Sequence, residues 1–175
     1  MTTPTLHEMM NVIPTLGWEG FTPNSAAKEL GTEPHHIPTK RDLLRRFHQH
    51  ITDTLQKTLK TEDITDAEPL DCVMEVMLCR LELLIPFRPA LKRIYQDLKE
   101  DPCLLKESFT LDFLEMDWLS TLLPTRTPLP AKVLGGIYWL TVRHWIKNEP
   151  ENIESAMSYM DKALGWVKEI GVFTR

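Results

Sequence analysis

The chain has 175 residues, of which 42% are hydrophobic and 26% are charged. This composition is that of an ordinary soluble globular protein, long enough to bury a sizeable core as one large domain or as a small head on a larger body. The net charge of −5 gives no basic footprint of a nucleic-acid binder. The first 50 residues hold five basic and five acidic residues, so the whole negative charge falls on the rest, a distribution compatible with DNA binding through the neutral head.

The N-terminus has no basic segment followed by an apolar run, and no stretch approaches about 18 uninterrupted apolar residues. We therefore expect a cytoplasmic protein without a signal peptide or transmembrane segment. The three cysteines, Cys72, Cys79 and Cys103, lie in apolar stretches. Two helical turns, about 10 Å, separate the first two, which is too far for a disulfide, so we predict reduced, buried thiols.

The first predicted helix begins at Thr3-Pro4, and Pro14 should end or kink it. Trp18 and Phe21 follow and are predicted to be core residues. The apolar face of this helix consists of Leu6, Met9, Met10 and Ile13.

A second helix is expected to start at Thr22-Pro23. A threonine N-cap accepts a hydrogen bond from the unpaired backbone amides of the first helical turn. Proline suits the first helical position, because the backbone N–H that it lacks would have no partner there. Gly31 should end this helix in a left-handed conformation. Thr32, which directly follows Gly31, can then be the N-cap of another very short helix. Two helices with almost no loop between them indicate a helix-turn-helix.

From Thr39 a long helix is predicted to reach about Leu59, with Asp42 at its third position. It links a head, residues 1–50, to a body, residues 51–175. Its apolar face consists of Leu43, Leu44, Phe47, Ile51, Leu55 and Leu59.

The body should contain five further helices, which makes the chain all-α with nine helices. Acidic residues 61–69 form a turn, and prolines make residues 124–130 a rigid loop. The helices cover about 69–85, then a stretch to Leu98 after the break at Pro86 and Pro89, then 102–123, 131–147 and 151–170.

Two body helices are more apolar than one buried face requires. Helix 69–85 is apolar on most sides. Helix 102–123 has more apolar side chains than one buried face can hold, so we expect the remaining ones to contact a partner chain or to line a cavity. We predict a pocket for an apolar or lipid ligand, lined by Met74, Met77, Leu78, Phe109, Phe113, Trp118 and Tyr138.

The last two helices have broad apolar faces, as a four-helix dimer bundle requires. The alternative is tight packing within one chain. The predicted homodimer contacts are Ile137, Trp145, Ile153, Met157, Met160, Leu164 and Val167.

Residue types that support catalysis or metal binding are not arranged for it. His35 and His36 are adjacent, so their side chains point about 100° apart on a helix, and His48 is expected to pack beside an apolar face. A Gly-rich phosphate loop, a GxSxG motif and a serine triad are all missing from the sequence. We therefore predict no enzyme activity, metal or cofactor.

The head shows the residue order Phe21-Thr22, Ala26-Ala27, Leu30-Gly31, then Pro38-Thr39-Lys40 and Leu43-Leu44. This order resembles the DNA-binding head of TetR-type transcriptional regulators. Because Ile37 is followed directly by Pro38, the second helix is shorter than in that family by about one turn. The resemblance implies a three-helix helix-turn-helix head on a helical ligand-binding and dimerisation body. Double-stranded DNA would be contacted by Thr32, His35, His36, Lys40, Arg41 and Arg45.

A second set of residues covers more of the chain: Ile13-Pro14 with Gly17-Trp18, Phe47-His48, the run RLELLIP from Arg80 to Pro86, and WIKNEP from Trp145 to Pro150. This set resembles the lipid-binding accessory proteins of ubiquinone biosynthesis, which share the TetR fold. That resemblance implies binding of an isoprenoid lipid or quinone in place of DNA.

The helix caps and linking helix of the head favour a TetR-type regulator with an apolar ligand pocket. A ubiquinone-biosynthesis lipid-binding protein that has lost DNA binding is the alternative, and a plain dimeric scaffold is a third class. Glu33 and Pro34 count against the regulator, because a carboxylate repels phosphate and accepts a hydrogen bond only from cytosine among the bases.

Overall fold

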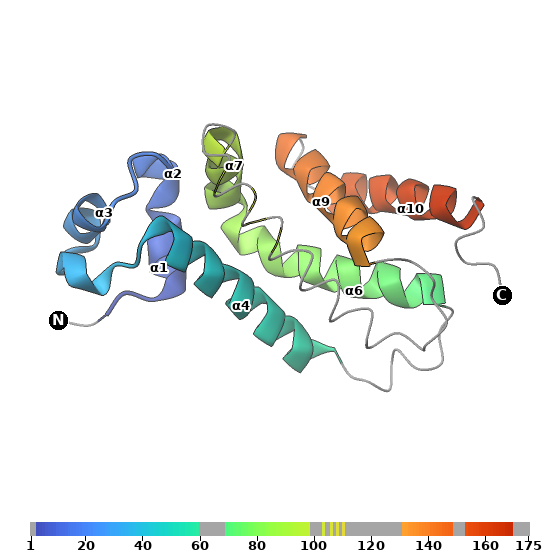
Figure 1. Cartoon of the computed structure of the whole chain (residues 1–175), viewed down its shortest axis with the longest axis horizontal. Helices are drawn as coiled ribbons and strands as arrows, with labels where there is room; N and C mark the ends of the chain where they lie inside the picture. Colours follow the sequence, from blue (N-terminus) through green and yellow to red (C-terminus); the bar gives the residue numbers. More distant parts are fainter. Residues whose placement is uncertain are drawn as a thin grey trace. The chain divides into compact units, whose positions relative to one another are not determined.

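The computed structural model describes residues 3–59, 69–98, 131–148 and 153–169, together with the single residues 103, 106, 108 and 110 (Figure 1). All regular secondary structure in these ranges is helical, which confirms the predicted all-α class for them. The chain divides into a first unit, Met1–His50 with Leu84–Phe109, and a second unit, Ile51–Leu83 with Thr110–Arg175. The first unit thus contains the whole predicted head and also residues from the predicted body.

The chain begins with two short helices, α1 (Leu6–Asn11) and α2 (Ile13–Leu16). Thr5 and Glu8 form a reciprocal capping box, with the Thr5 backbone N–H donating to Glu8 Oε2 at 2.7 Å. The predicted start at Thr3 is therefore wrong, because only Thr5 has a glutamate three residues later. Pro14 lies in the first turn of α2, where a backbone N–H would have no partner within the helix, so proline costs no hydrogen bond there.

Helix α3 (Pro23–Leu30) has the predicted ends. Thr22 caps its start in a capping box with Ser25, and Gly31 ends it with a left-handed φ of 62°. The next helix, η1 (Pro34–His36), is a single 3₁₀ turn whose N-cap residue makes no side-chain bond. The prediction that Thr32 caps it is wrong, because the chain is extended for one more residue before η1 begins.

Helix α4 (Lys40–Thr58) begins at the predicted cap. The Thr39 hydroxyl accepts from the Asp42 backbone N–H at 3.2 Å and donates to the Asp42 carboxylate at 2.7 Å. Its predicted apolar face is buried at Leu43, Leu44, Phe47, Ile51 and Leu55, while Leu59, predicted on the same face, follows the helix and is half-buried.

The chain continues through α6 (Pro69–Leu84), the 3₁₀ turn η2 (Ile85–Phe87) and α7 (Arg88–Asp97). Pro86 and Pro89 each occupy the first turn of a new helix, as the predicted break requires. Within the first unit, α7 packs against α1 and α2. This packing completes a core around the buried residues Met9, Met10, Ile13, Trp18, Phe21, Leu91 and Ile94.

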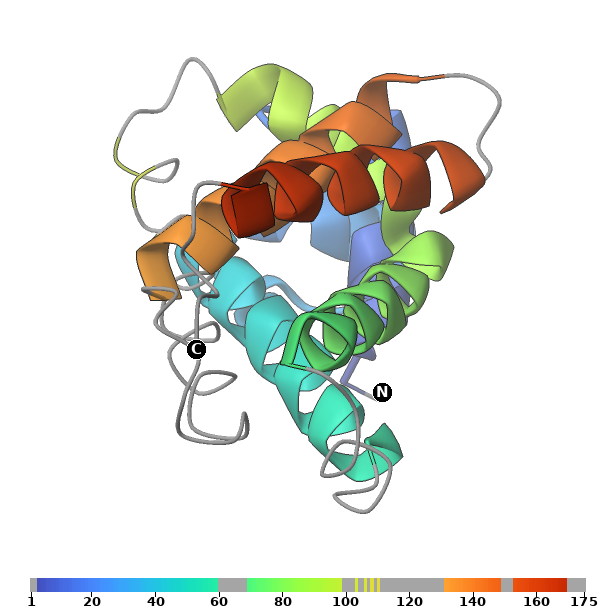
Figure 2. The ribbon, with the colours of Figure 1, turned by 90° about the vertical axis from the view of Figure 1, so that its right-hand side faces the viewer.

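The last two helices, α9 (Ala131–Lys147) and α10 (Ile153–Glu169), agree closely with the predicted ranges. They pack side by side within the second unit (Figures 1 and 2). Residues 61–68 of the predicted turn 61–69 and the predicted loop at 124–130 lie outside the described residues, as does most of the predicted helix 102–123. In the described part of the chain, none of the helices has the length and hydropathy needed to span a bilayer.

Candidate functional site

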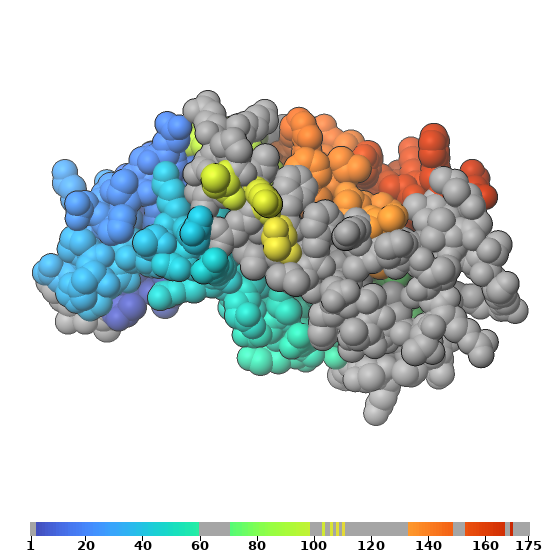
Figure 3. Space-filling model, in the orientation of Figure 1, coloured from blue at the N-terminus to red at the C-terminus, as the bar shows by residue number. Residues whose placement is uncertain are grey.

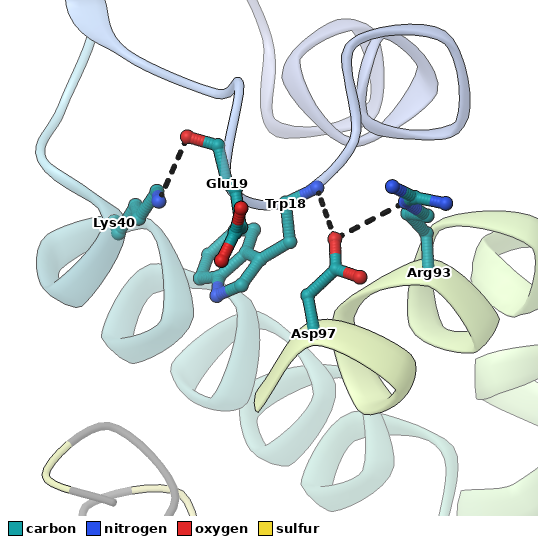
Figure 4. A network of polar contacts seen from close by, with 5 residues as sticks. All are labelled: Trp18, Glu19, Lys40, Arg93 and Asp97. Atoms are coloured by element: carbon teal, nitrogen blue, oxygen red, sulfur yellow. Dashed lines mark hydrogen bonds and ion pairs between the residues drawn. The ribbon is translucent and has the colours of Figure 1, made fainter. Parts of the chain in front are cut away.

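The turn between α2 and α3 is fixed by contacts from two other helices of the first unit (Figure 4). Its first residue, Gly17, has a φ of 74°, which glycine adopts without strain. The Trp18 backbone N–H donates to Asp97 Oδ2 of α7 at 2.9 Å, and Arg93 Nε lies 3.1 Å from the same oxygen. The Trp18 ring, 2% exposed, stacks on Phe21. These contacts bind the turn firmly to α7.

Lys40, a predicted phosphate contact, approaches the same turn from α4. Its Nζ donates to the Glu19 carbonyl at 3.2 Å and lies 5.6 Å from the centroid of the Trp18 ring (Figure 4). A lysine held by a carbonyl and an aromatic face must give up both contacts to reach a phosphate. The cation nearest to η1 on α4 therefore has a structural role in this state of the chain.

The other predicted DNA-binding residues also lie in the first unit. Arg41 and Arg45 are exposed one turn apart on α4, and His35 is exposed on η1. The His36 ring lies 4.0 Å from the His35 ring, and its Nδ1 is 3.2 Å from the Thr32 hydroxyl. The structure thus places the predicted DNA-binding side chains on η1, the residues before it and the start of α4.

The predicted ligand-binding residues that the structure describes come from α6 and α9. Met77 and Tyr138 are fully buried, and Met74 and Leu78 are half-buried. Phe109, Phe113 and Trp118 lie outside the residues whose side chains are described.

Beside these residues is a charged group that sequence reasoning missed. Arg80 of α6 is 3% exposed, and its guanidinium carbon lies 4.5 Å from the centroid of the Tyr138 ring. Arg80 follows Met77 by three residues, which places both on the same side of α6. The three-residue spacing between Met77 and Arg80 could have revealed this group from the sequence, because it places a cation next to a predicted pocket residue.

The predicted dimer residues are largely covered within the single chain. Trp145, Met160 and Leu164 are fully buried and Ile137 is nearly so, while Ile153 and Met157 are half-buried. The side chain of Val167 lies outside the described residues. Among the described side chains of α9 and α10, the large apolar ones that are exposed are Val133, Leu140 and Trp166, the last being 72% exposed. Atoms of these two helices form part of the surface seen in Figure 3 (orange and red).

His144 joins α9 to α10 through a small polar cluster. Its ring stacks on Tyr159 at 4.6 Å, and its Nε2 lies 3.1 Å from Ser155 Oγ and 2.8 Å from Asn148 Nδ2. A histidine that activates a serine directs its lone pair at the hydroxyl alone. Here the amide of Asn148 meets the same nitrogen, so the cluster is suited to holding the two helices together.

Of the three cysteines, only Cys72 is buried, so the prediction of buried thiols is wrong for Cys79 and Cys103. Cys79 is half-buried and its Sγ lies 3.6 Å from Glu75 Oε1, while Cys103 is exposed. Partial burial and the neighbouring Glu75 carboxylate raise the pKa of Cys79 to about 11. Burial also raises the pKa of Cys72.

These pKa shifts predict the order in which the thiols react. At pH 8 a thiol with a pKa of about 11 is thiolate in only about one molecule in a thousand, and the thiolate is the nucleophile. We expect iodoacetamide at pH 8 to label exposed Cys103 first and Cys79 and Cys72 far more slowly, as measured by mass spectrometry of peptides. Labelling of Cys79 as fast as Cys103 would contradict this assignment.

The described residues contain no group of three or more His, Cys, Asp or Glu side chains placed to hold a metal ion. Comparison with known proteins finds no match, either to a protein-family model or to a curated protein sequence.

Proposed function

We propose that this protein binds an isoprenoid or quinone lipid in its second unit, as the lipid-binding accessory proteins of ubiquinone biosynthesis do, and acts in the cytoplasm. In this proposal the fold is TetR-like and the helix-turn-helix head has become a structural part that does not read DNA. The observation that favours lipid binding over DNA binding is the short length of η1, the turn that would have to be the recognition helix.

A recognition helix reads bases with side chains from its N-terminal turns while it lies in the major groove. η1 has three residues, and at about 2 Å per residue it spans roughly 6 Å. Glu33 precedes it and Pro34 begins it, so this turn presents few groups suited to base edges. With Lys40 bound to Glu19 and Trp18, the geometry of the head supports packing better than DNA recognition.

The apolar surface of the second unit supports lipid binding. Val133, Leu140 and Trp166 are exposed on α9 and α10, and Met74 and Leu78 are only half-buried on α6. Tryptophan is favoured where an apolar phase meets water, because its ring is apolar and its N–H can reach a polar partner. A protein that takes up lipid from a membrane needs surface groups of this kind.

The test is a transfer assay with phospholipid vesicles that contain a long-chain isoprenoid quinone. After gel filtration we expect quinone to remain with the protein, and we expect Trp166→Lys to slow the transfer several-fold. Ser158→Lys is the matched control, since it places the same charge at another exposed position of α10. The proposal is wrong if the wild-type protein retains no quinone.

DNA binding by the first unit is the second candidate, because α3 keeps both of its predicted ends and Arg41 and Arg45 are exposed on α4, the helix that follows η1 in the chain. Each phosphate contact adds about one unit to the magnitude of the slope of log affinity against log salt, so a dimer with two or three contacts per head gives a slope of roughly four to six.

Fluorescence anisotropy with promoter duplexes tests this second candidate. Under the lipid-binding proposal we expect no binding at low salt. A slope of roughly four to six would instead establish the regulator. In that case Lys40→Ala with Arg41→Ala would weaken binding to all sequences alike, and His36→Ala would change sequence preference.

A further inference from the structure

One face of α9 is open to solvent along the whole helix. We call it the α9 outer face, and its exposed or half-buried residues are Val133, Gly136, Leu140, Arg143 and Lys147. At about 100° per residue, these five positions fall within an arc of about 80° around the helix axis. In the described chain, a Cβ atom added to Gly136 would meet no side chain and no other helix within 4 Å. The middle of the face is therefore open as well as its two ends.

The charge of α9 is opposite to that of the whole chain. The chain has a net charge of −5, whereas residues 131–147 include Lys132, Arg143 and Lys147 and no aspartate or glutamate. Among the described residues, neither Arg143 nor Lys147 has a carboxylate partner. The last turns of the outer face are thus basic, and its first turns are apolar.

Arg143 is held by an aromatic ring of its own helix. Its guanidinium carbon lies 5.3 Å from the centroid of the Trp139 ring, close enough for a cation–π contact. The N–H donors of arginine lie in the guanidinium plane and point outward from its edge, in the geometry that suits a phosphate group. Contact with a ring face fixes the position of the guanidinium and leaves that edge available to an anion.

A helix face that is apolar in one half and basic in the other suits the surface of an anionic bilayer. Apolar side chains enter the boundary between headgroups and acyl chains, while the long stems of lysine and arginine carry their charges to the phosphates. Anionic lipids attract each such basic residue by about fivefold in affinity. A bilayer therefore satisfies both halves of the α9 outer face at once.

We propose that the α9 outer face docks on membranes that contain anionic phospholipid, and so brings the second unit to the lipid that it takes up. The proposal rests on the lipid-binding function proposed above and identifies the surface through which that lipid is reached. In the docked state Val133 and Leu140 contact acyl chains next to the headgroups, and Arg143 and Lys147 bind lipid phosphates.

The experiment measures binding of the full-length protein to sedimenting vesicles, either of phosphatidylcholine alone or of phosphatidylcholine mixed with phosphatidylglycerol. We expect the wild type to bind the anionic vesicles roughly 25-fold more tightly, about fivefold for each of two basic residues, and to lose this preference as salt is raised. Arg143→Gln with Lys147→Gln should abolish the preference. Leu140→Gln should weaken binding to both kinds of vesicle.

Lys57→Gln with Lys162→Gln is the matched control, because it removes the same charge from exposed positions of α4 and α10 in the same unit. It should keep the preference for anionic vesicles, and circular dichroism shows whether each variant is folded. If the Arg143 variant does not fold, Lys147→Gln alone decides, since its side chain is exposed and its loss should weaken anionic-vesicle binding about fivefold.

A wild type without preference for anionic vesicles overturns the docking proposal, and so do Arg143 and Lys147 variants that bind them as the wild type does. A Leu140→Gln change that turns a dimer into a monomer and leaves vesicle binding unchanged also overturns it, because a second copy would then cover this face. Quinone supplied in detergent micelles tests the underlying function separately. Wild type and double variant should retain it equally, and a wild type that retains none overturns the proposed function itself.

Discussion

Replacing Met160 with lysine is expected to unfold the second unit, and not merely to separate two subunits. Met160 is 0% exposed in the single chain and belongs to α10, which packs against α9. An unpaired ammonium group in that position costs about 3–5 kcal/mol, against a total stability of about 5–15 kcal/mol for an ordinary domain. Circular dichroism during urea denaturation should show a strongly lowered midpoint or no folded baseline.

The matched control is Trp166→Lys, which introduces the same side chain into the same helix at a position that is 72% exposed. This variant should keep the wild-type midpoint. It also tests the predicted homodimer, which stays a prediction: if the exposed apolar residues of α9 and α10 form the interface, sedimentation at micromolar concentration should show a dimer for the wild type and a monomer for Trp166→Lys. A folded, fully stable Met160→Lys monomer would contradict this assignment.

The second large effect is expected for Trp18→Ala. The Trp18 side chain is 2% exposed, stacks on Phe21 with ring centroids 6.0 Å apart, and lies beneath the Lys40 ammonium. Truncating a buried tryptophan to alanine typically costs about 3–5 kcal/mol, because packing is lost and a cavity remains. Urea denaturation should show this loss.

Trp166→Ala is the control for this measurement, since it removes the same side chain from an exposed site and should change stability by less than about 0.5 kcal/mol. Asp97→Asn should lie between the two, because it weakens the 2.9 Å bond from the Trp18 N–H and the ion pair with Arg93. A Trp18→Ala variant as stable as Trp166→Ala would show that the turn is not held as described.

Helix ends were predictable where a few neighbouring residues determine them. Thr22 with Pro23, Gly31, and Thr39 with Asp42 all act as expected, because capping bonds and a left-handed glycine are local chemistry. The predicted start of α1 was wrong for a related reason. Thr3 and Thr5 are both possible N-caps, and the reciprocal hydrogen bonds between Thr5 and Glu8 select Thr5.

Burial within the body was predictable only in part. The apolar stripe of α10 predicted that Met160 and Leu164 would be buried, but periodicity alone cannot tell whether another helix of the same chain or a second chain covers them. The same pattern did not reveal that Arg80 is buried, because its partner Tyr138 is 58 residues away in the sequence. Contacts of that range depend on the fold and not on local pattern.

Native mass spectrometry of the purified protein shows whether the second unit holds an isoprenoid lipid. The predicted result is an added mass equal to one isoprenoid or quinone lipid per chain, which is released on collisional activation and identified in the extract. Protein that carries only its own mass after gentle purification, and again after incubation with quinone-containing vesicles, would contradict the claim.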